Sequence, residues 1–175
     1  MVTPRYIVDE IGDVVQAVSD AMTGFTVTYM YGNGLEIVDN CKRMAQVAAS
    51  AETRFPLVAL IQDFKETVND RGQRECDLNL IIANITDKRY RADERYQHSF
   101  KPYLYPIYTE LLNQLSKSGA FVIADANRIP HDKYDRVFWG AQEVYGEVNP
   151  FSDAIDAIEI ENLRLTLTNK INCYE

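Results

Sequence analysis

The segment from residue 157 to residue 168, AIEIENLRLTLT, decides the fold because apolar and polar residues alternate along it with a period of two. The alternation is interrupted once, since the apolar residues are even-numbered up to Ile160 and odd-numbered from Leu163 onward. One extra residue shifts the apolar face in this way when a strand contains a β-bulge. We therefore predict one long strand with a bulge near Glu161 and Asn162.

Hydrophobic spacing in the rest of the chain predicts helices and strands in a mixed order. Thr3 and Pro4 are typical of a helix N-cap and first turn, and Gly24 follows the helical repeat that they begin. Pro102 and Pro106 each lack an amide donor, so we expect a kinked pair of helices there. The predicted helices cover 4–22, 35–50, 91–101 and 103–118, and the predicted strands cover 25–31, 55–61, 77–86, 121–124, 134–139 and 157–168. This order predicts one α+β domain over residues 1–175, with a mixed β-sheet and helices packed mainly on one face.

The polar segment from Asp63 to Arg74 lies between two apolar runs and contains the turn signal Asn69-Asp70-Arg71-Gly72. We expect a long β-hairpin whose charged tip projects into solvent and serves as an interaction surface. The candidate contact residues are Asp63, Lys65, Asp70, Arg71 and Arg74.

A nuclease is an alternative interpretation of the same region. Asp63, Glu75 and Asp77, followed by a lysine such as Lys65, resemble the carboxylates of metal-dependent nucleases. A solvated hairpin explains them equally well, and the net charge of −8 disfavours a DNA substrate.

A second predicted interaction surface is the loop from Trp139 to Phe151, in which Trp139, Tyr145 and Phe151 lie beside two glycines. The alternative is that these aromatic residues only cap the core. The same two interpretations apply to three tyrosines near the expected kink, Tyr103, Tyr105 and Tyr108.

Composition excludes several classes of protein. The net charge of −8 and the lack of a long basic cluster argue against specific nucleic-acid binding. The first apolar stretch contains Asp9, Glu10 and Asp13, which is unlike a signal peptide, and no apolar run approaches the ~20 residues of a membrane span. We therefore expect a cytoplasmic protein without membrane contact.

Catalytic and cofactor motifs are not found. Cys41, Cys76 and Cys173 have no Cys-x-x-Cys spacing, and His98 and His131 lie far apart, so we expect buried thiols and no metal site. A cysteine nucleophile with a distant histidine stays formally open. The Gly32-Asn33-Gly34 segment lacks the Lys-Ser/Thr of a phosphate-binding loop, and we expect it to close a strand. We expect no cofactor and no enzyme, with a noncanonical active site as the alternative.

The layout of these segments resembles the tail terminator, or tail-completion, proteins of long-tailed bacteriophages and related contractile devices. The residues that carry the likeness are Tyr29-Met30-Tyr31-Gly32, Leu35-Glu36-Ile37, Phe55-Pro56-Leu57-Val58-Ala59-Leu60, Arg95, Phe100, Leu104-Tyr105-Pro106-Ile107-Tyr108, Asp135-Arg136-Val137-Phe138-Trp139-Gly140 and the strand from Ile158 to Leu167.

The resemblance implies a structural protein that closes into a ring, commonly six-fold, at the end of the tail tube. Such a ring stops tube polymerisation and joins the tail to the neck. The implied partners are other copies of the chain, the tail tube protein and a neck or connector protein, with DNA passing through an acidic lumen. The implied locations are the host cytoplasm during assembly and then the virion tail. A non-ring accessory or inhibitory binding protein is the alternative.

Overall fold

The segment that decides the fold forms one strand, β7 (Ala154–Leu167), in a computed structural model that describes residues 5–124, 129–137 and 154–168. The predicted bulge is confirmed. Leu78 of the neighbouring strand lies opposite Leu163, and Leu80 lies opposite Ile160, so that Asn79 faces two residues of β7. Asn162 adopts a φ of 53°, and its N–H donates to Asn79 Oδ1 at 2.9 Å. The bulge therefore keeps the apolar residues on both sides of it on one face.

The other elements follow the predicted order in most places. The helices are α1 (Ile7–Ala21), α2 (Gly34–Gln46), α3 (Ala48–Ala51), α4 (Ala92–Arg95), the π-helix η1 (Tyr96–Leu104) and α5 (Tyr105–Lys117). The remaining strands are β1 (Thr28–Gly32), β2 (Leu57–Ile61), β3 (Lys65–Val68), β4 (Arg74–Thr86), β5 (Phe121–Ile123) and β6 (His131–Val137).

The described strands form one mixed sheet in the order β1-β2-β4-β7-β5, with β3 also paired to β4 and β6 also paired to β7. Only the β1–β2 pair is parallel, and the other pairs are antiparallel. The prediction of a single-sheet α+β fold is confirmed.

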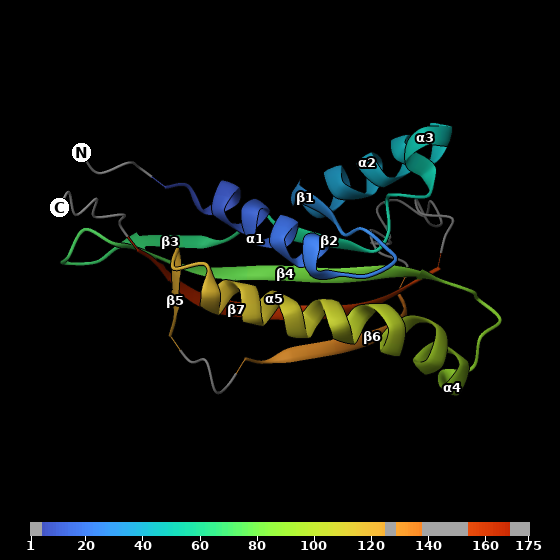
Figure 1. The fold of residues 1–175 in the computed structure, drawn as a ribbon. Helices are drawn as coiled ribbons and strands as arrows, with labels where there is room; N and C mark the ends of the chain where they lie inside the picture. The colour runs from blue at the N-terminus through green and yellow to red at the C-terminus, as the bar shows by residue number, and fades with distance from the viewer. Residues whose placement is uncertain (1–4, 125–128, 138–153, 169–175) are drawn as a thin grey trace, which may run out of the picture.

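Two layers of helices bury the sheet unequally. The larger core joins α1, η1 and α5 to one face and includes Ile11, Leu80, Leu111 and Ile160, all fully buried. A smaller core lies on the opposite face, where Ile37 and Cys41 of α2 pack against β1 and β2. Figure 1 shows α1 and α5 side by side across the sheet, with α2 and α3 near one end of it. The helices thus lie mainly on one face, as predicted.

Several predicted boundaries are wrong, and the strands expected from 25, 77 and 157 begin at Thr28, Arg74 and Ala154. Tyr6 is extended, with φ −117° and ψ 132°, so the first helix starts at Ile7, and the proposed cap at Thr3 lies outside the described residues. The helix expected over 35–50 is interrupted at Val47, which is also extended. The strand expected from residue 134 begins earlier, at His131, because His131 and Asp132 pair with β7.

Pro102 does not separate two helices as predicted. It lies inside η1, and α4, η1 and α5 follow one another without an intervening loop. The N–H of Tyr105 bonds to the carbonyl of Phe100, five residues earlier. This wider hydrogen-bond pattern accommodates the proline, which cannot donate to the usual acceptor of an α-helix.

A buried ion pair attaches this helical run to the sheet. Arg95 and Asp156 have side chains that are 1% and 0% exposed, and Arg95 Nη1 lies 3.6 Å from Asp156 Oδ1. Arg95 also donates from Nε to the carbonyl of Tyr90 at 3.1 Å. These contacts join the start of the helix, the preceding loop and β7.

Replacing Asn162 by alanine should lower the free energy of unfolding by about 1 kcal/mol, because alanine tolerates the left-handed conformation poorly. Asn162→Gly should cost less, since glycine adopts this conformation freely. Urea unfolding of the two variants and the parent checks this. Equal stability of the alanine and glycine variants would show that the bulge backbone relaxes.

Arg95→Met should destabilise the fold by about 3–5 kcal/mol, because it leaves the Asp156 carboxylate buried without its counter-charge. The double variant Arg95→Met/Asp156→Leu should recover most of that loss. Thermal and urea unfolding measure both. A double variant no more stable than the single one would contradict the pairing.

Candidate functional site

The predicted hairpin exists, but its projecting part is shorter than the sequence indicates. Lys65 to Val68 pair with Asp77 to Arg74, so most of the supposed tip belongs to the sheet. A tight turn closes the ladder. Asn69 Oδ1 accepts from the N–H groups of Arg71 and Gln73 at 3.0 Å each, and Gly72 has a φ of 70°. This turn extends beyond Arg74 and Leu167, the last pair of β4 and β7 at this end of the sheet (Figure 1).

The five predicted hairpin residues lie in three different places. Asp70 and Arg71 are exposed in the turn, and Asp63 is exposed in the link between β2 and β3. Lys65 points to the face opposite the larger core, because it pairs with Asp77. Arg74 points to the other face, where its Nη1 lies 3.5 Å from Glu66 Oε1. They therefore do not form one surface.

Trp139, Tyr145 and Phe151, predicted as a second interaction surface, lie outside the described residues. Tyr103, Tyr105 and Tyr108 are each partly buried against the larger core. One side of each tyrosine ring thus packs against the core, and the other side is accessible to solvent.

The sheet face around Lys65 is polar and contains a hollow of about 220 Å³, which is lined by Lys65, Thr67, Glu75, Cys76, Asp77 and Arg164. Arg164 of β7 donates from Nε to Asp77 Oδ1 at 2.8 Å, and Lys65 lies opposite the same Asp77 in β3. Lys65, Asp77 and Arg164 therefore form a row of positive, negative and positive side chains across β3, β4 and β7. Arg164 was missed by sequence reasoning, because 87 residues separate it from Asp77 and only the strand register brings them together.

For the nuclease alternative, Lys65, Glu75 and Asp77 line one hollow on the sheet face, whereas Asp63 lies outside it. Asp77 is bound to Arg164, and nowhere in residues 5–124, 129–137 and 154–168 do three histidine, cysteine or acidic side chains gather as metal ligands. Asp63 lies before β3, whereas Glu75 and Asp77 lie on β4.

The predicted burial of Cys41 and Cys76 is confirmed, and both are free thiols. Burial raises the pKa of the Cys41 thiol to about 11. Burial, with Glu66 and Asp77 nearby, raises the pKa of the Cys76 thiol to about 12. Because the thiolate is the nucleophilic form, neither cysteine is activated. Cys173 lies outside the described residues.

The two histidines have separate surroundings. His98 stacks against Tyr90, with ring centroids 5.1 Å apart. His131 Nδ1 lies 3.0 Å from the hydroxyl of Tyr108. Each histidine therefore contacts a different tyrosine.

The Gly32-Asn33-Gly34 segment closes β1, as predicted, and begins α2. Asn33 Oδ1 accepts from the N–H of Glu36, and the Glu36 carboxylate accepts from the N–H of Asn33, both at 3.0 Å. Gly32 has a φ of 151°, and a Cβ there would lie 2.9 Å from Glu36 Oε2. The backbone N–H groups of Asn33 and Glu36, which a bound phosphate would need, are thus already hydrogen-bonded within this capping box.

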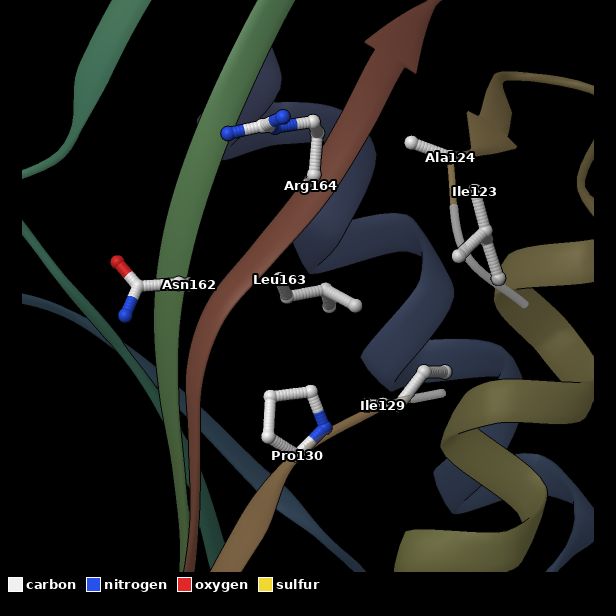
Figure 2. A pocket seen from close by; sticks show the side chains of 7 residues that line it. All are labelled: Ile123, Ala124, Ile129, Pro130, Asn162, Leu163 and Arg164. Carbon is white, nitrogen blue, oxygen red and sulfur yellow. The ribbon is translucent and has the colours of Figure 1, made fainter. Parts of the chain in front are cut away.

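A cavity of about 250 Å³ lies beside the bulge, where β5 ends and β6 has not yet begun. Its described lining is mostly apolar and consists of Ile123, Ala124, Ile129, Pro130, Asn162, Leu163 and Arg164. In Figure 2, the isoleucines and Leu163 point toward one another, whereas the Asn162 and Arg164 side chains point to the other side of the strand. Polar groups do not converge in this cavity as they do in an active site.

Tyrosines of α5 contact β6. Lys133 Nζ donates to the hydroxyl of Tyr105 at 2.6 Å and lies 5.2 Å from the centre of its ring. Together with the contact between His131 and Tyr108, this makes an aromatic and cationic patch at the β6 side of the sheet.

In comparison with known proteins, the chain matches no protein-family model and no curated protein. Among the described residues, no helix has the length and apolarity to cross a membrane.

In a Cys173→Ser background, Cys41 and Cys76 should react with a thiol reagent at pH 8 only on the timescale of unfolding. Both are buried, and their raised pKa values keep them protonated at this pH. Absorbance of the released chromophore follows the reaction, and urea-denatured protein, with two reactive thiols, is the control. Rapid labelling of the native protein would contradict the assignment.

Proposed function

We propose that this chain is a ring-forming structural protein of the tail terminator type, which ends the tail tube and joins it to the neck. The observation that supports this most is the distribution of polar side chains. They lie on strand faces, in the hairpin turn and along the sheet margins, whereas the cavity beside the bulge is mostly apolar. Surfaces of this kind suit docking between proteins rather than chemistry on a small molecule.

The charged face around Asp77 supports a docking role. Arg164 is 66% exposed, whereas Asp77 is held at 29% exposure by its neighbours. Exposed ion pairs contribute little to stability, so this arrangement has little value for the fold alone. It supplies alternating charges on a rigid surface, which favours one orientation of a partner over others.

The shape of the sheet supports assembly into a ring. A ring requires two different surfaces of each copy to contact one another, and unpaired strand edges are suitable for such contacts. β1 pairs only with β2, and β6 pairs only with β7, among the described residues. β1 and β6 therefore lie at opposite edges of the sheet.

The net charge of −8 fits the proposed passage of DNA, because an acidic lumen repels phosphate and does not retain it. On this proposal the protein assembles in the host cytoplasm and remains in the virion tail, with the tail tube and a neck or connector protein as its partners. It holds no cofactor and performs no reaction.

Co-expression with the tail tube protein of the same genome tests this function. Electron microscopy should show tubes that are shorter than those formed by the tube protein alone, with additional density at one end. The variant Asp77→Arg, which reverses the centre of the charged face, reports whether that face contacts the tube. Tubes of unchanged length without terminal density would contradict the proposal.

A further inference from the structure

The free edge of β1 carries hydrogen-bonding groups that point away from the sheet. The N–H of Thr28 donates to the carbonyl of Pro56, and the carbonyl of Gly32 accepts from Gln62, so the even-numbered residues face β2. Because successive residues of a strand alternate in direction, Tyr29 and Tyr31 turn their N–H and C=O groups outward. Tyr31 is 39% exposed.

A hollow of about 370 Å³ runs along this edge. Its lining includes four consecutive residues of β1, from Thr28 to Tyr31, together with Asn40, Arg43 and Met44 on one side of α2. Side chains on one face of a strand alternate, so a lining of consecutive residues indicates the strand edge itself. The edge therefore lies beside a groove that can receive an extended strand.

The strand at the opposite edge of the sheet, β6, runs in the direction that pairing with β1 of another copy requires. β1 and β2 are parallel, and three antiparallel pairs connect β2 through β4 and β7 to β6. β6 therefore runs opposite to β1. A second copy placed beside the first, without being turned over, would bring its β6 antiparallel to β1.

The helix α1, which packs on β1, is acidic on its exposed side, whereas Arg43 of α2 lies in the groove on the other face. Residues 6–41 contain six acidic residues and no lysine, arginine or histidine. On α1, the exposed residues Asp9, Asp13 and Asp20 lie at spacings of four and seven, which places them on one side of the helix. Like charges four residues apart destabilise a helix, so Asp9 and Asp13 would gain from a cationic partner.

The margin at β6 carries Lys133 and aromatic rings on the same side of the sheet as α1. His131 and Lys133 are exposed and pair with Ile160 and Ile158, both of which belong to the larger core under the helices. Asp132 alternates to the opposite face. Lys133 is held by Tyr105, which makes it a pre-organised cation beside a partly buried aromatic ring.

We propose that copies of this chain join through β1 of one copy and β6 of the next, with the acidic side of α1 against the neighbour's Lys133 and His131. This contact is heterologous, because the two surfaces differ, and repetition around an axis closes a ring. It extends each sheet across the junction and satisfies the outward groups of Tyr29 and Tyr31. The inference rests on the proposed ring and identifies its self-contact.

Two charge reversals test the contact. Asp13→Lys places a lysine against the neighbour's Lys133, and Lys133→Glu places a glutamate against the neighbour's Asp13, so each variant alone should lose the ring that the parent forms. An equimolar mixture should restore it with the two variants alternating, since every junction then again joins opposite charges. Native mass spectrometry with one variant isotopically labelled measures the composition.

Matched controls place the same charge changes in the hairpin turn. Asp70→Lys and Arg71→Glu should keep the ring of the parent. Tyr31→Pro should also abolish the ring while the monomer stays folded by circular dichroism, because an edge strand tolerates proline where the amide faces solvent.

The outcomes separate the two proposals. A parent protein that forms rings, together with single reversals that leave them intact or a mixture that fails to restore them, overturns this contact and leaves the ring standing. A parent that stays monomeric under all conditions overturns the ring and this contact together.

Discussion

The antiparallel ladder between β4 and β7 is the contact on which the rest of the structure depends. β2 and β3 pair with β4, β5 and β6 pair with β7, and β1 is attached through β2. Both helical layers pack on strands that this ladder positions. The bulge opposite Asn79 preserves the ladder, because without it the apolar residues on one side of Glu161 would face the wrong layer.

Features that depend on local periodicity could be predicted from the sequence. The change of apolar parity between Ile160 and Leu163 locates the bulge, and the Asn-Asp-Arg-Gly run locates the hairpin turn. The switch between helical and strand spacing gives the fold class. Each of these signals lies within a few residues, so the amino-acid order is sufficient to find it.

Features that depend on register or on nonlocal packing could not be predicted. Arg164 reaches Asp77 only because β4 and β7 pair in one register. The ion pair of Arg95 and Asp156 joins a helix to a strand that follows much later in the chain. Pro102 indicates a helix break, but it cannot show that a π-helix accommodates it. The length of the hairpin turn was overestimated because the polar side chains of β3 are typical of a loop.

The proposed function is based on the edges and faces of the sheet rather than on a pocket. The acidic segment from residue 6 to residue 41 can be recognised in the sequence. Its role in assembly depends on the topology, which places it at the opposite edge of the sheet from Lys133. Charge at one margin then complements charge at the other. Two unlike, complementary margins allow copies to add in one direction, whereas a self-complementary surface stops at a dimer.

The most direct test of this account is the native mass of the purified chain over a wide concentration range. The account expects a discrete assembly of several copies, in equilibrium with monomer and weakened by salt, because charge contributes to the contact. A mass that stays that of the monomer at every concentration, or a two-fold dimer that grows no further, would contradict it.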